Sequence, residues 1–354
     1  MNIWTTLGIN LIIFILFWLV VFFVPHKISV AGTPQGFSEK QCVINNITLN
    51  YVEGPKNGLP FLLIPGQMES WQGYKSVMPE LARKYHVFSV DLRGHGRSTR
   101  TPGQYSYNIC GDDLKQFIAQ VIGEPAIVSG LSSGGVLAVW LGAYAPEWVR
   151  AVISEDPPMF SSIYPRITEE RYMRRMFQVA IDNLGSPTGP NLEAYLANSG
   201  APKEGQEELL MVPPAVLKIL MALYAVNRRL KPNQPYDVPF LPFEMRVGVK
   251  FFMEYDVDFS KATIDGRLSR DFDPLAALKK VKCPMLLMQA HWSRHAYWGL
   301  LGAMDSQDVD QIKSLVKNLR YAFIDSSHGI HIGEPAWYLQ QVEIFLQEVN
   351  ADSL

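Results

Sequence analysis

The sequence AIVSGLSSGGVLAVWLGAY, residues 126–144, reads as a buried strand, a tight turn and an apolar helix in succession. Residues 126–130 predict the strand and residues 134–144 the helix, because each run is dominated by apolar and small side chains. Between them, Gly130-Leu131-Ser132-Ser133-Gly134 matches the pattern G-x-S-x-G. In this pattern the serine stands on a strained turn, so the residues two positions away must be small. The register selects Ser132, because Ser133 would need a glycine where Leu131 stands.

Strands and helices alternate on both sides of this unit. The expected strands are residues 40–53, 60–64, 86–91, 149–154, 284–289 and 320–324, and the expected helices are residues 71–85, 112–122, 306–318 and 335–349. Such alternation predicts an α/β fold with a mostly parallel sheet and helices on both faces. It stops over residues 159–270, where the pattern is helical, broken by prolines and rich in Met, Leu and Tyr. We therefore expect a core of residues 38–158 and 271–350 with an inserted helical cap, residues 159–270.

The overall composition narrows the possible partners. The 354 residues are 48% apolar and 19% charged, with a formal net charge of −2. This balance, without clustered Lys/Arg beside aromatic residues, argues against nucleic acid as a partner. The three cysteines, Cys42, Cys110 and Cys283, lie far apart and form no CxxC pair. We therefore expect neither a metal site nor a disulfide framework, and no cofactor.

The N-terminal segment is long and apolar. Residues 3–25 contain no charged side chain, and such a length spans a hydrocarbon core of about 30 Å. The pattern predicts a single-pass transmembrane anchor. A cleaved signal peptide, ending near Ser29-Val30-Ala31 and leaving a secreted protein, is one alternative, and a buried helix is another. The side of the membrane stays open, because Lys27 favours a cytoplasmic domain and the sequon at Asn46 a lumenal one.

A serine hydroxyl is a weak nucleophile that needs a neighbouring base. His328 follows the expected strand 320–324 and precedes the last helix, a place from which a base reaches the serine. The chain order, serine before histidine, also fits. His331 is the rival base. His95 lies in a glycine-rich loop, for which we expect a structural role.

Taken together, these motifs resemble those of the α/β-hydrolase fold superfamily over residues 40–350. The matching residues are Pro65-Gly66-Gln67 with Trp71, Asp91-Leu92-Arg93-Gly94-His95-Gly96-Arg97-Ser98, Gly130-Leu131-Ser132-Ser133-Gly134, and His328 followed by Glu334-Pro335. The resemblance implies that the backbone N–H groups of Gln67 and Ser133 hold the oxyanion. The family usually has His-Gly where this chain has Pro65-Gly66, but only the backbone donates, so this change should preserve the oxyanion hole.

The acidic member of the expected triad departs from the commonest family pattern. The family usually places an Asp shortly after strand 284–289, near Ser293, but Asp305 is the first carboxylate there. Asp156 ends the strand 149–154, 24 residues after Ser132. This placement resembles that in some haloalkane dehalogenases and the zearalenone-type lactonases, which carry their acid at the end of the corresponding strand. Asp156 is therefore our predicted acid, with Glu155 and Asp305 as alternatives. The remaining alternative is that Asp156 merely caps its strand, and that the enzyme works as a serine–histidine dyad or not at all.

The resemblance implies a serine hydrolase that cleaves a carboxylic ester or lactone through an acyl-enzyme on Ser132. The apolar stretch 211–226 predicts either the core of the cap or a substrate tunnel or lid, and with the N-terminal segment it favours a hydrophobic small-molecule substrate. The alternatives are a C–C bond hydrolase with the same triad and a non-catalytic binding protein on the same fold. Dehalogenase and epoxide hydrolase chemistry is disfavoured, because those relatives need Asp where Ser132 stands. The oligomeric state stays open.

Overall fold

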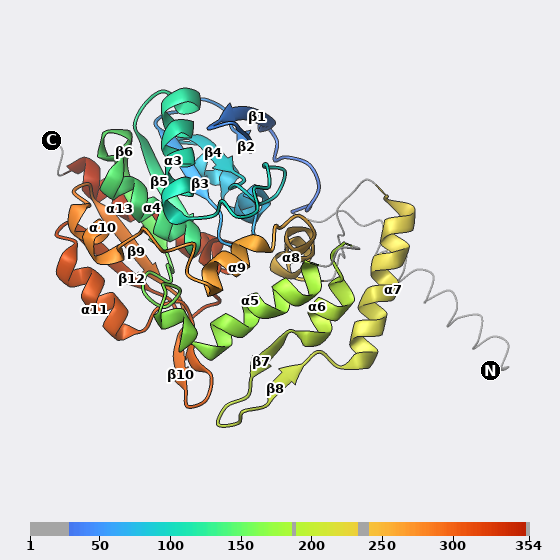
Figure 1. Cartoon of the computed structure of the whole chain (residues 1–354). Coiled ribbons are helices and arrows are strands. Elements are labelled where there is room, and N and C mark those ends of the chain that lie inside the picture. Colours follow the sequence, from blue (N-terminus) through green and yellow to red (C-terminus); the bar gives the residue numbers. More distant parts are fainter. Residues whose placement is uncertain (1–27, 186–188, 233–240, 352–354) are drawn as a thin grey trace, which may run out of the picture.

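The computed structural model describes residues 28–185, 189–232 and 241–351, which contain an eight-stranded sheet (Figure 1). In spatial order its strands are β1 (Ser38–Ile44), β2 (Ile47–Glu53), β4 (His86–Val90), β3 (Pro60–Ile64), β5 (Ala126–Leu131), β6 (Val149–Glu155), β9 (Met285–Gln289) and β12 (Leu319–Phe323). β1 and β2 form an antiparallel hairpin and β2 is antiparallel to β4, whereas every further pair in the sheet is parallel. The predicted α/β fold with a mostly parallel sheet is confirmed.

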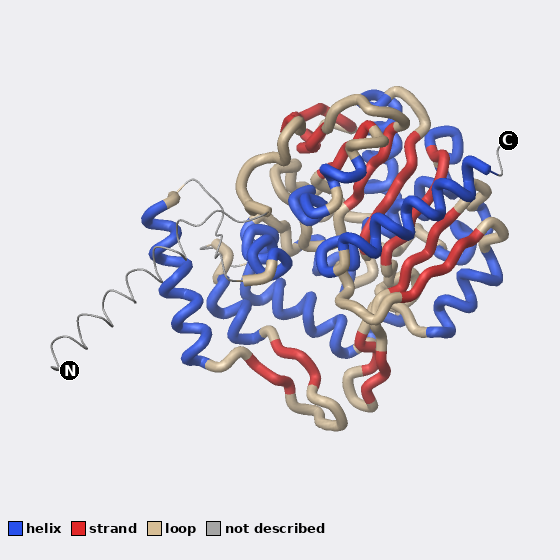
Figure 2. Tube along the Cα trace, turned by 180° about the vertical axis from the view of Figure 1, so that it is seen from behind, coloured by secondary structure: helices blue, strands red, loops and turns tan. Residues whose placement is uncertain are grey.

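Each face of the sheet buries its own apolar core, because successive strand side chains point to opposite sides. In β3, Leu62 and Ile64 belong to one core, and Phe61 and Leu63 belong to the other. The first core packs against α3 (Tyr107–Phe117), α4 (Ser133–Tyr144), α10 (Pro274–Lys280) and α11 (Ser306–Leu315). The second packs against η1 (Trp71–Ser76), α2 (Met78–Leu81) and α13 (Pro335–Ala351), which crosses that face in Figure 2. Two short helical segments connect these elements: η2 (Ile118–Ile122) lies between α3 and β5, and η3 (Pro146–Trp148) lies between α4 and β6.

One predicted helix is wrong in length. Residues 71–85 do not form a continuous helix, because only η1 and the four-residue α2 are helical there. Gly73 has low helix propensity, and Pro79 cannot donate the hydrogen bond that would continue the first turn into the second.

The chain between β6 and β9 forms a group of helices beside the sheet (Figure 1). It comprises η4 (Arg166–Thr168), α5 (Arg171–Leu184), α6 (Leu192–Asn198), α7 (Pro214–Leu230), α8 (Phe243–Met253), α9 (Asp258–Ile264) and a hairpin of β7 (Gly200–Pro202) and β8 (Leu209–Met211). The sequence pattern did not indicate this hairpin. The boundaries of the expected cap, 159 and 270, stay a prediction. A second small hairpin, β10 (Ser293–His295) with β11 (Gly299–Leu301), follows β9.

The predicted membrane localisation requires correction. Among the described residues, no helix combines the length and the apolar character needed to cross a bilayer. The expected anchor, residues 3–25, lies outside the described residues. The structure therefore gives no support to a single-pass membrane protein, and we withdraw that expectation.

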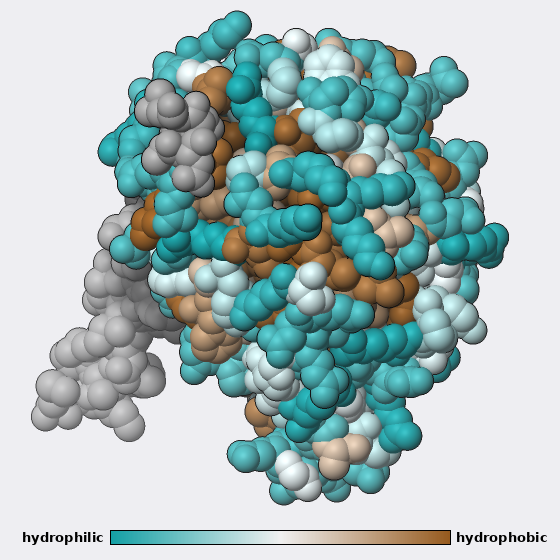
Figure 3. Space-filling model, turned by 90° about the vertical axis from the view of Figure 1, so that its left-hand side faces the viewer, coloured by the Kyte–Doolittle hydropathy of each residue, from teal (hydrophilic) through white to brown (hydrophobic). Residues whose placement is uncertain are grey.

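The sheet ends at the exposed strand β12. The side of the molecule on which this strand lies shows an apolar strip between polar residues (Figure 3), and Phe323 is 49% exposed. Charged side chains flank the strand: Arg320 pairs with Glu348, and the Lys313 ammonium lies 3.9 Å from the centre of the Tyr321 ring. Such charges protect an edge strand from pairing with another chain.

Candidate active site

Ser132 occupies the sharp turn between β5 and α4 that the sequence predicts. Its φ of 55° and ψ of −122° lie outside the regions that ordinary residues favour. A Cβ on Gly130 would lie 2.1 Å from the Gly134 carbonyl oxygen, and a Cβ on Gly134 would lie 2.3 Å from the Ile64 carbonyl oxygen. Both glycines are therefore required for β5, α4 and β3 to meet at this turn.

His328 and Asp156 meet across the carboxyl edge of the sheet. Nδ1 of His328 lies 2.6 Å from Oδ2 of Asp156, and Oδ1 of Asp156 accepts a 3.1 Å hydrogen bond from the Ala290 backbone N–H. The Asp156 side chain is 2% exposed, whereas that of His328 is 46% exposed. This contact assigns the Nδ1 proton to the bond with Asp156, so Nε2 is the nitrogen left to act as a base.

The two alternative acids contact other partners. The carboxylate of Glu155 accepts hydrogen bonds from the backbone N–H and the ring of His331. Asp305 caps α11 and pairs with Arg294. In the described structure, neither contacts His328, whereas Asp156 does.

The other two histidines considered are buried away from Ser132. His331 is fully buried, and its ring stacks on Tyr74 with centroids 3.9 Å apart. His95 directs Nδ1 to the Arg93 carbonyl at 3.0 Å, and burial lowers its pKa to about 4. A histidine that stays neutral and buried in a loop fits the structural role expected for His95.

The turn that holds Gln67 passes directly beside the serine. A Cβ on Gly66 would lie 3.3 Å from the Ser132 Cβ, and Gln67 lines the same cavity as Ser132. The side-chain amide of Gln67 is fixed by Ser260 of α9 and by Tyr255, three residues before that helix, because its Nε2 donates to Tyr255 and Ser260 at 2.9 and 3.1 Å. Ser133 is the first residue of α4, so its N–H is one of the donors that a helix leaves unpaired at its start.

Ser132 and His328 line one cavity of about 350 Å³, a size typical of small-molecule sites. Most of its wall is apolar, comprising Met68, Pro158, Met173, Met176, Phe177, Leu300 and Ala303. The described part of this wall contains no Asp, Glu, Lys or Arg. The cavity therefore offers apolar surface beside the serine and little that would compensate a charged group.

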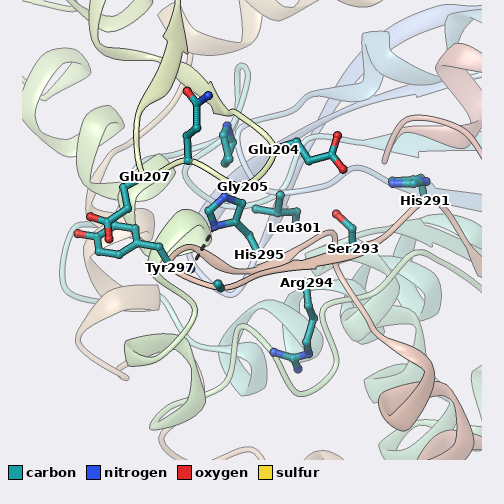
Figure 4. Close-up of a pocket in the computed structure, with 12 residues that line it drawn as sticks. Glu204, Gly205, Glu207, His291, Ser293, Arg294, His295, Tyr297 and Leu301 are labelled. Carbon is teal, nitrogen blue, oxygen red and sulfur yellow. Dashed lines mark hydrogen bonds between the residues drawn. The ribbon is translucent and has the colours of Figure 1, made fainter.

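A larger cavity of about 840 Å³ lies between the β7–β8 and β10–β11 hairpins (Figure 4). Its wall carries charged and ionisable side chains: Glu204 and Glu207 come from one hairpin, and Arg294 and His295 from the other. β11 separates the two cavities, since Leu301 lines the larger and Leu300 the smaller. Ser132 and His328 are absent from the described wall of the larger cavity, so we do not take it as the reaction site.

Known proteins resemble this chain in sequence and in fold. A sequence model of the alpha/beta hydrolase fold matches residues 60–234. AB hydrolase superfamily protein YfhM of Bacillus subtilis (strain 168) is 34% identical over 118 residues, which cover 32% of this chain and 41% of that protein. Bifunctional epoxide hydrolase 2 of Sus scrofa is 32% identical over 119 residues, which cover 33% of this chain and 21% of that protein. The crystal structure of carboxylesterase CesB (YbfK) from Bacillus subtilis aligns with a TM-score of 0.59 at 18% identity, covering 88% of this chain and 92% of that chain. The chain belongs to the α/β-hydrolase fold superfamily.

The relatives within this superfamily differ in chemistry. The matched segments span less than half the length of the two curated relatives, and the structural likeness at 18% identity shows the fold alone. Their activities therefore do not pass directly to this α/β-hydrolase. A function for this chain must therefore be inferred from the residues of its own site.

The helix that lines the cavity is α5, which the sequence pattern did not indicate as part of the site. The apolar stretch 211–226 was predicted to form either the core of the cap or a substrate tunnel or lid, but residues of α7 are absent from the described wall of this cavity, and Ile219 is 60% exposed. Met173, Met176 and Phe177 of α5 line the cavity instead. Their spacing of three and four residues marks one face of a helix, and that signal was available in the sequence.

Three carboxylates set the charge around His328. Partial removal from water lowers the pKa of His328, but the hydrogen bond and charge of Asp156, with the charges of Glu69 and Glu155, outweigh this and raise it above its ordinary value. Burial raises the pKa of Glu69, although His331 and His328 oppose that shift. The surroundings of this α/β-hydrolase site therefore stabilise an imidazolium, the state that a general base reaches after taking a proton.

Proposed function

We propose that this α/β-hydrolase is a serine hydrolase that cleaves an uncharged, apolar carboxylic ester or lactone through an acyl-enzyme on Ser132. The observation that carries the proposal is the shared cavity: Ser132 and His328 line one apolar space, and Asp156 holds the ring of His328 from behind at 2.6 Å. A nucleophile, a base and an orienting acid in this relation are the parts that acyl transfer requires.

In the proposed reaction, Ser132 Oγ attacks the substrate carbonyl carbon while His328 Nε2 takes the hydroxyl proton. The backbone N–H groups of Gln67 and Ser133 stabilise the oxyanion of the tetrahedral intermediate. His328 returns the proton to the leaving alkoxide, which departs as an alcohol, or stays attached when the substrate is a lactone. A water molecule then attacks the acyl-enzyme, with His328 again as base, and releases the acid and free Ser132. Asp156 stabilises the imidazolium in both halves of the reaction.

The apolar wall supports the choice of substrate class. Burying a charged acyl group without a partner is costly, and the described wall supplies no Lys or Arg to pair with a carboxylate. Each methylene buried there is worth about 0.8 kcal/mol, or about fourfold in kcat/KM. Epoxide opening is not proposed, because the nucleophile position holds Ser132 rather than the Asp which that chemistry needs.

A substrate panel tests the proposal. 4-Nitrophenyl esters from acetate to octanoate, a neutral lactone, a succinate monoester and an epoxide would be compared on the wild type and Ser132→Ala. We expect kcat/KM to rise with acyl length until the cavity is full, the charged ester to be poor, and all turnover to vanish in Ser132→Ala. A preference for the succinate ester, or turnover that survives the substitution, would refute the proposal.

A further inference from the structure

Glu155 joins the segment of the nucleophile to the segment of the base. Its carbonyl oxygen accepts a 2.8 Å hydrogen bond from the Ser132 backbone N–H. Its carboxylate accepts hydrogen bonds from the His331 backbone N–H at 2.8 Å and from His331 Nδ1 at 2.9 Å. His331 lies in α12 (Ile330–Gly333), which begins two residues after His328. One residue therefore holds both sides of the expected nucleophile–base pair.

This second carboxylate–imidazole pair is fully buried. The side chains of Glu155 and His331 are both 0% exposed. Tyr74 stacks on the His331 ring, and the Tyr338 ring meets it edge-on with centroids 5.9 Å apart. A buried ionisable pair is often no more stabilising than apolar side chains of similar size, so stability alone does not account for the pair.

The carboxylate of Glu69 lies near Nε2 of His331, the ring nitrogen that does not contact Glu155. Nε2 of His331 has no hydrogen-bond partner among the described residues. A methyl group at Gly73 would lie 3.5 Å from Oε2 of Glu69 and 3.6 Å from this nitrogen. Oε2 of Glu69 also accepts a 3.4 Å hydrogen bond from the Gly66 backbone N–H, beside the expected oxyanion hole. Together with Glu69, the buried pair therefore connects the end of β6 to the turn that contains Gly66, beside Ser132.

We propose that Glu155 and His331 form a positioning pair that fixes the alignment of His328 with Ser132. The carbonyl of Glu155 holds the turn of the nucleophile, its carboxylate holds α12 behind the base, and Asp156, the next residue, contacts the base directly. The pair touches no substrate, so it acts only through Ser132 and His328. This inference rests on the proposed serine hydrolase function.

The test compares Glu155→Ala and Glu155→Gln with a matched pair of controls. Asp113 is an equally buried carboxylate whose contacts are Arg93 and Asn45, remote from the site. Glu155→Ala should lower kcat by about 10²-fold with KM unchanged, because a misplacement of about 1 Å has an effect of that size. Glu155→Gln keeps one acceptor oxygen for His331 and should recover much of kcat. Asp113→Ala and Asp113→Asn should lower stability yet leave kcat per folded molecule unchanged.

A double variant covers the case in which Glu155→Ala does not fold. Glu155→Met with His331→Phe replaces the pair by apolar side chains of similar size, an exchange that folded proteins often tolerate. It should remain folded by circular dichroism and show the same loss of kcat. A wild-type kcat in folded Glu155→Ala, or in this double variant, would overturn the positioning role.

The rate at which a fluorophosphonate labels Ser132 separates this inference from the proposed function. If the wild type labels but hydrolyses no ester, the proposed function fails, while the pair is still tested by labelling. We expect the labelling rate to fall in Glu155→Ala by the same factor as kcat. Equal labelling rates in the wild type and the variant would overturn the pair even if ester hydrolysis is found.

Discussion

Asp156 adopts a backbone conformation that few non-glycine residues tolerate, with φ of 39°. Its strand ends at Glu155, so the strained residue follows directly and turns its carboxylate towards His328. Residues held in such conformations persist only where their surroundings enforce them. At the residue scale, the strained backbone therefore occurs at Asp156 and Ser132. The proposed reaction depends on the orientation of the side chains of these two residues.

Replacing Asp156 by Asn should leave the fold intact and lower kcat by about 10⁴-fold, because the amide neither fixes the tautomer of His328 nor stabilises its imidazolium. Steady-state kinetics on protein shown to be folded by circular dichroism measures this loss. Asp113→Asn is the matched control, since Asp113 contacts Arg93 rather than His328. Near-normal turnover by Asp156→Asn would remove Asp156 from the mechanism.

The pH dependence follows from the raised pKa of His328. The base must be neutral to accept the serine proton, so activity is lost as the pH falls through this pKa. Asp156, Glu69 and Glu155 raise it, so the acid limb of kcat/KM should lie above the pH expected for an ordinary histidine. Glu69→Gln should move the limb to lower pH, and an unmoved limb would contradict this electrostatic account.

At the element scale, β5 and α4 approach the end of β3 so closely that side chains are excluded. Gly134 faces the carbonyl oxygens of Ile64 and Pro65, where a Cβ would lie at 2.3 and 2.6 Å. Backbone atoms cannot move aside as a flexible side chain would. The turn that presents Ser132 is thus set by backbone packing as well as by its own dihedral angles.

Gly134→Ala should therefore destabilise the protein by about 3 kcal/mol, the upper range for overpacking, and should reduce activity as the turn shifts. Urea unfolding and steady-state kinetics measure the two effects. Gly248→Ala is the control: it lies in α8, where the new methyl group would meet the Phe252 ring at an ordinary contact distance of 3.8 Å, and it should gain up to about 1 kcal/mol from helix propensity. Equal stability of the two variants would refute the packing argument.

At the same scale, local sequence patterns predict some features of the fold and the candidate site but not others. The G-x-S-x-G turn and the alternation of strands and helices are local signals, so they predict the sheet and place Ser132, Asp156 and His328 at its carboxyl edge. The link between Glu155 and His331 joins residues 176 positions apart, and no local pattern encodes it. The helix predicted over residues 71–85 is an error of a different kind, because the prediction continued a helix past Gly73 and Pro79, where the structure has only η1 and α2.

At the scale of the whole molecule, an ionic cluster links the inserted segment to the core. Arg166, before α5, pairs with Asp308 of α11 and with Glu170. Arg294 pairs with Asp305, and Glu170 accepts a 2.6 Å hydrogen bond from the Leu300 backbone N–H. Because Leu300 lines the cavity, this cluster fixes part of the cavity wall as well as the contact between the inserted segment and the core.

Arg166→Met should destabilise the protein by about 3 kcal/mol, because it leaves the buried carboxylate of Asp308 without its guanidinium. Arg83→Met, which breaks only an exposed pair with Glu80, should change stability by less than about 0.5 kcal/mol. Urea unfolding at neutral pH compares them. Equal stability of the two variants would show that the cluster does not hold the segments together.

The same cluster should make the protein sensitive to acid. Burial opposes the ionisation of Asp305, but the Asp308 N–H and the guanidinium of Arg294 outweigh it and lower the pKa of Asp305. A lowered pKa contributes stability that is present above the ordinary carboxyl pKa and is lost as the pH falls through the lowered value. Asp305→Asn should therefore flatten the acidic part of the stability–pH curve, and an unchanged curve would contradict this linkage.

The central claim is that Ser132 is an activated nucleophile, and covalent labelling tests it most directly. The full-length protein would be treated with a fluorophosphonate, and its intact mass and the modified peptide determined. We predict one adduct, on Ser132, that is absent in Ser132→Ala and forms far more slowly in His328→Gln. No adduct on folded wild-type protein, or an adduct that persists in Ser132→Ala, would contradict the claim and favour a non-catalytic binding protein on the same fold.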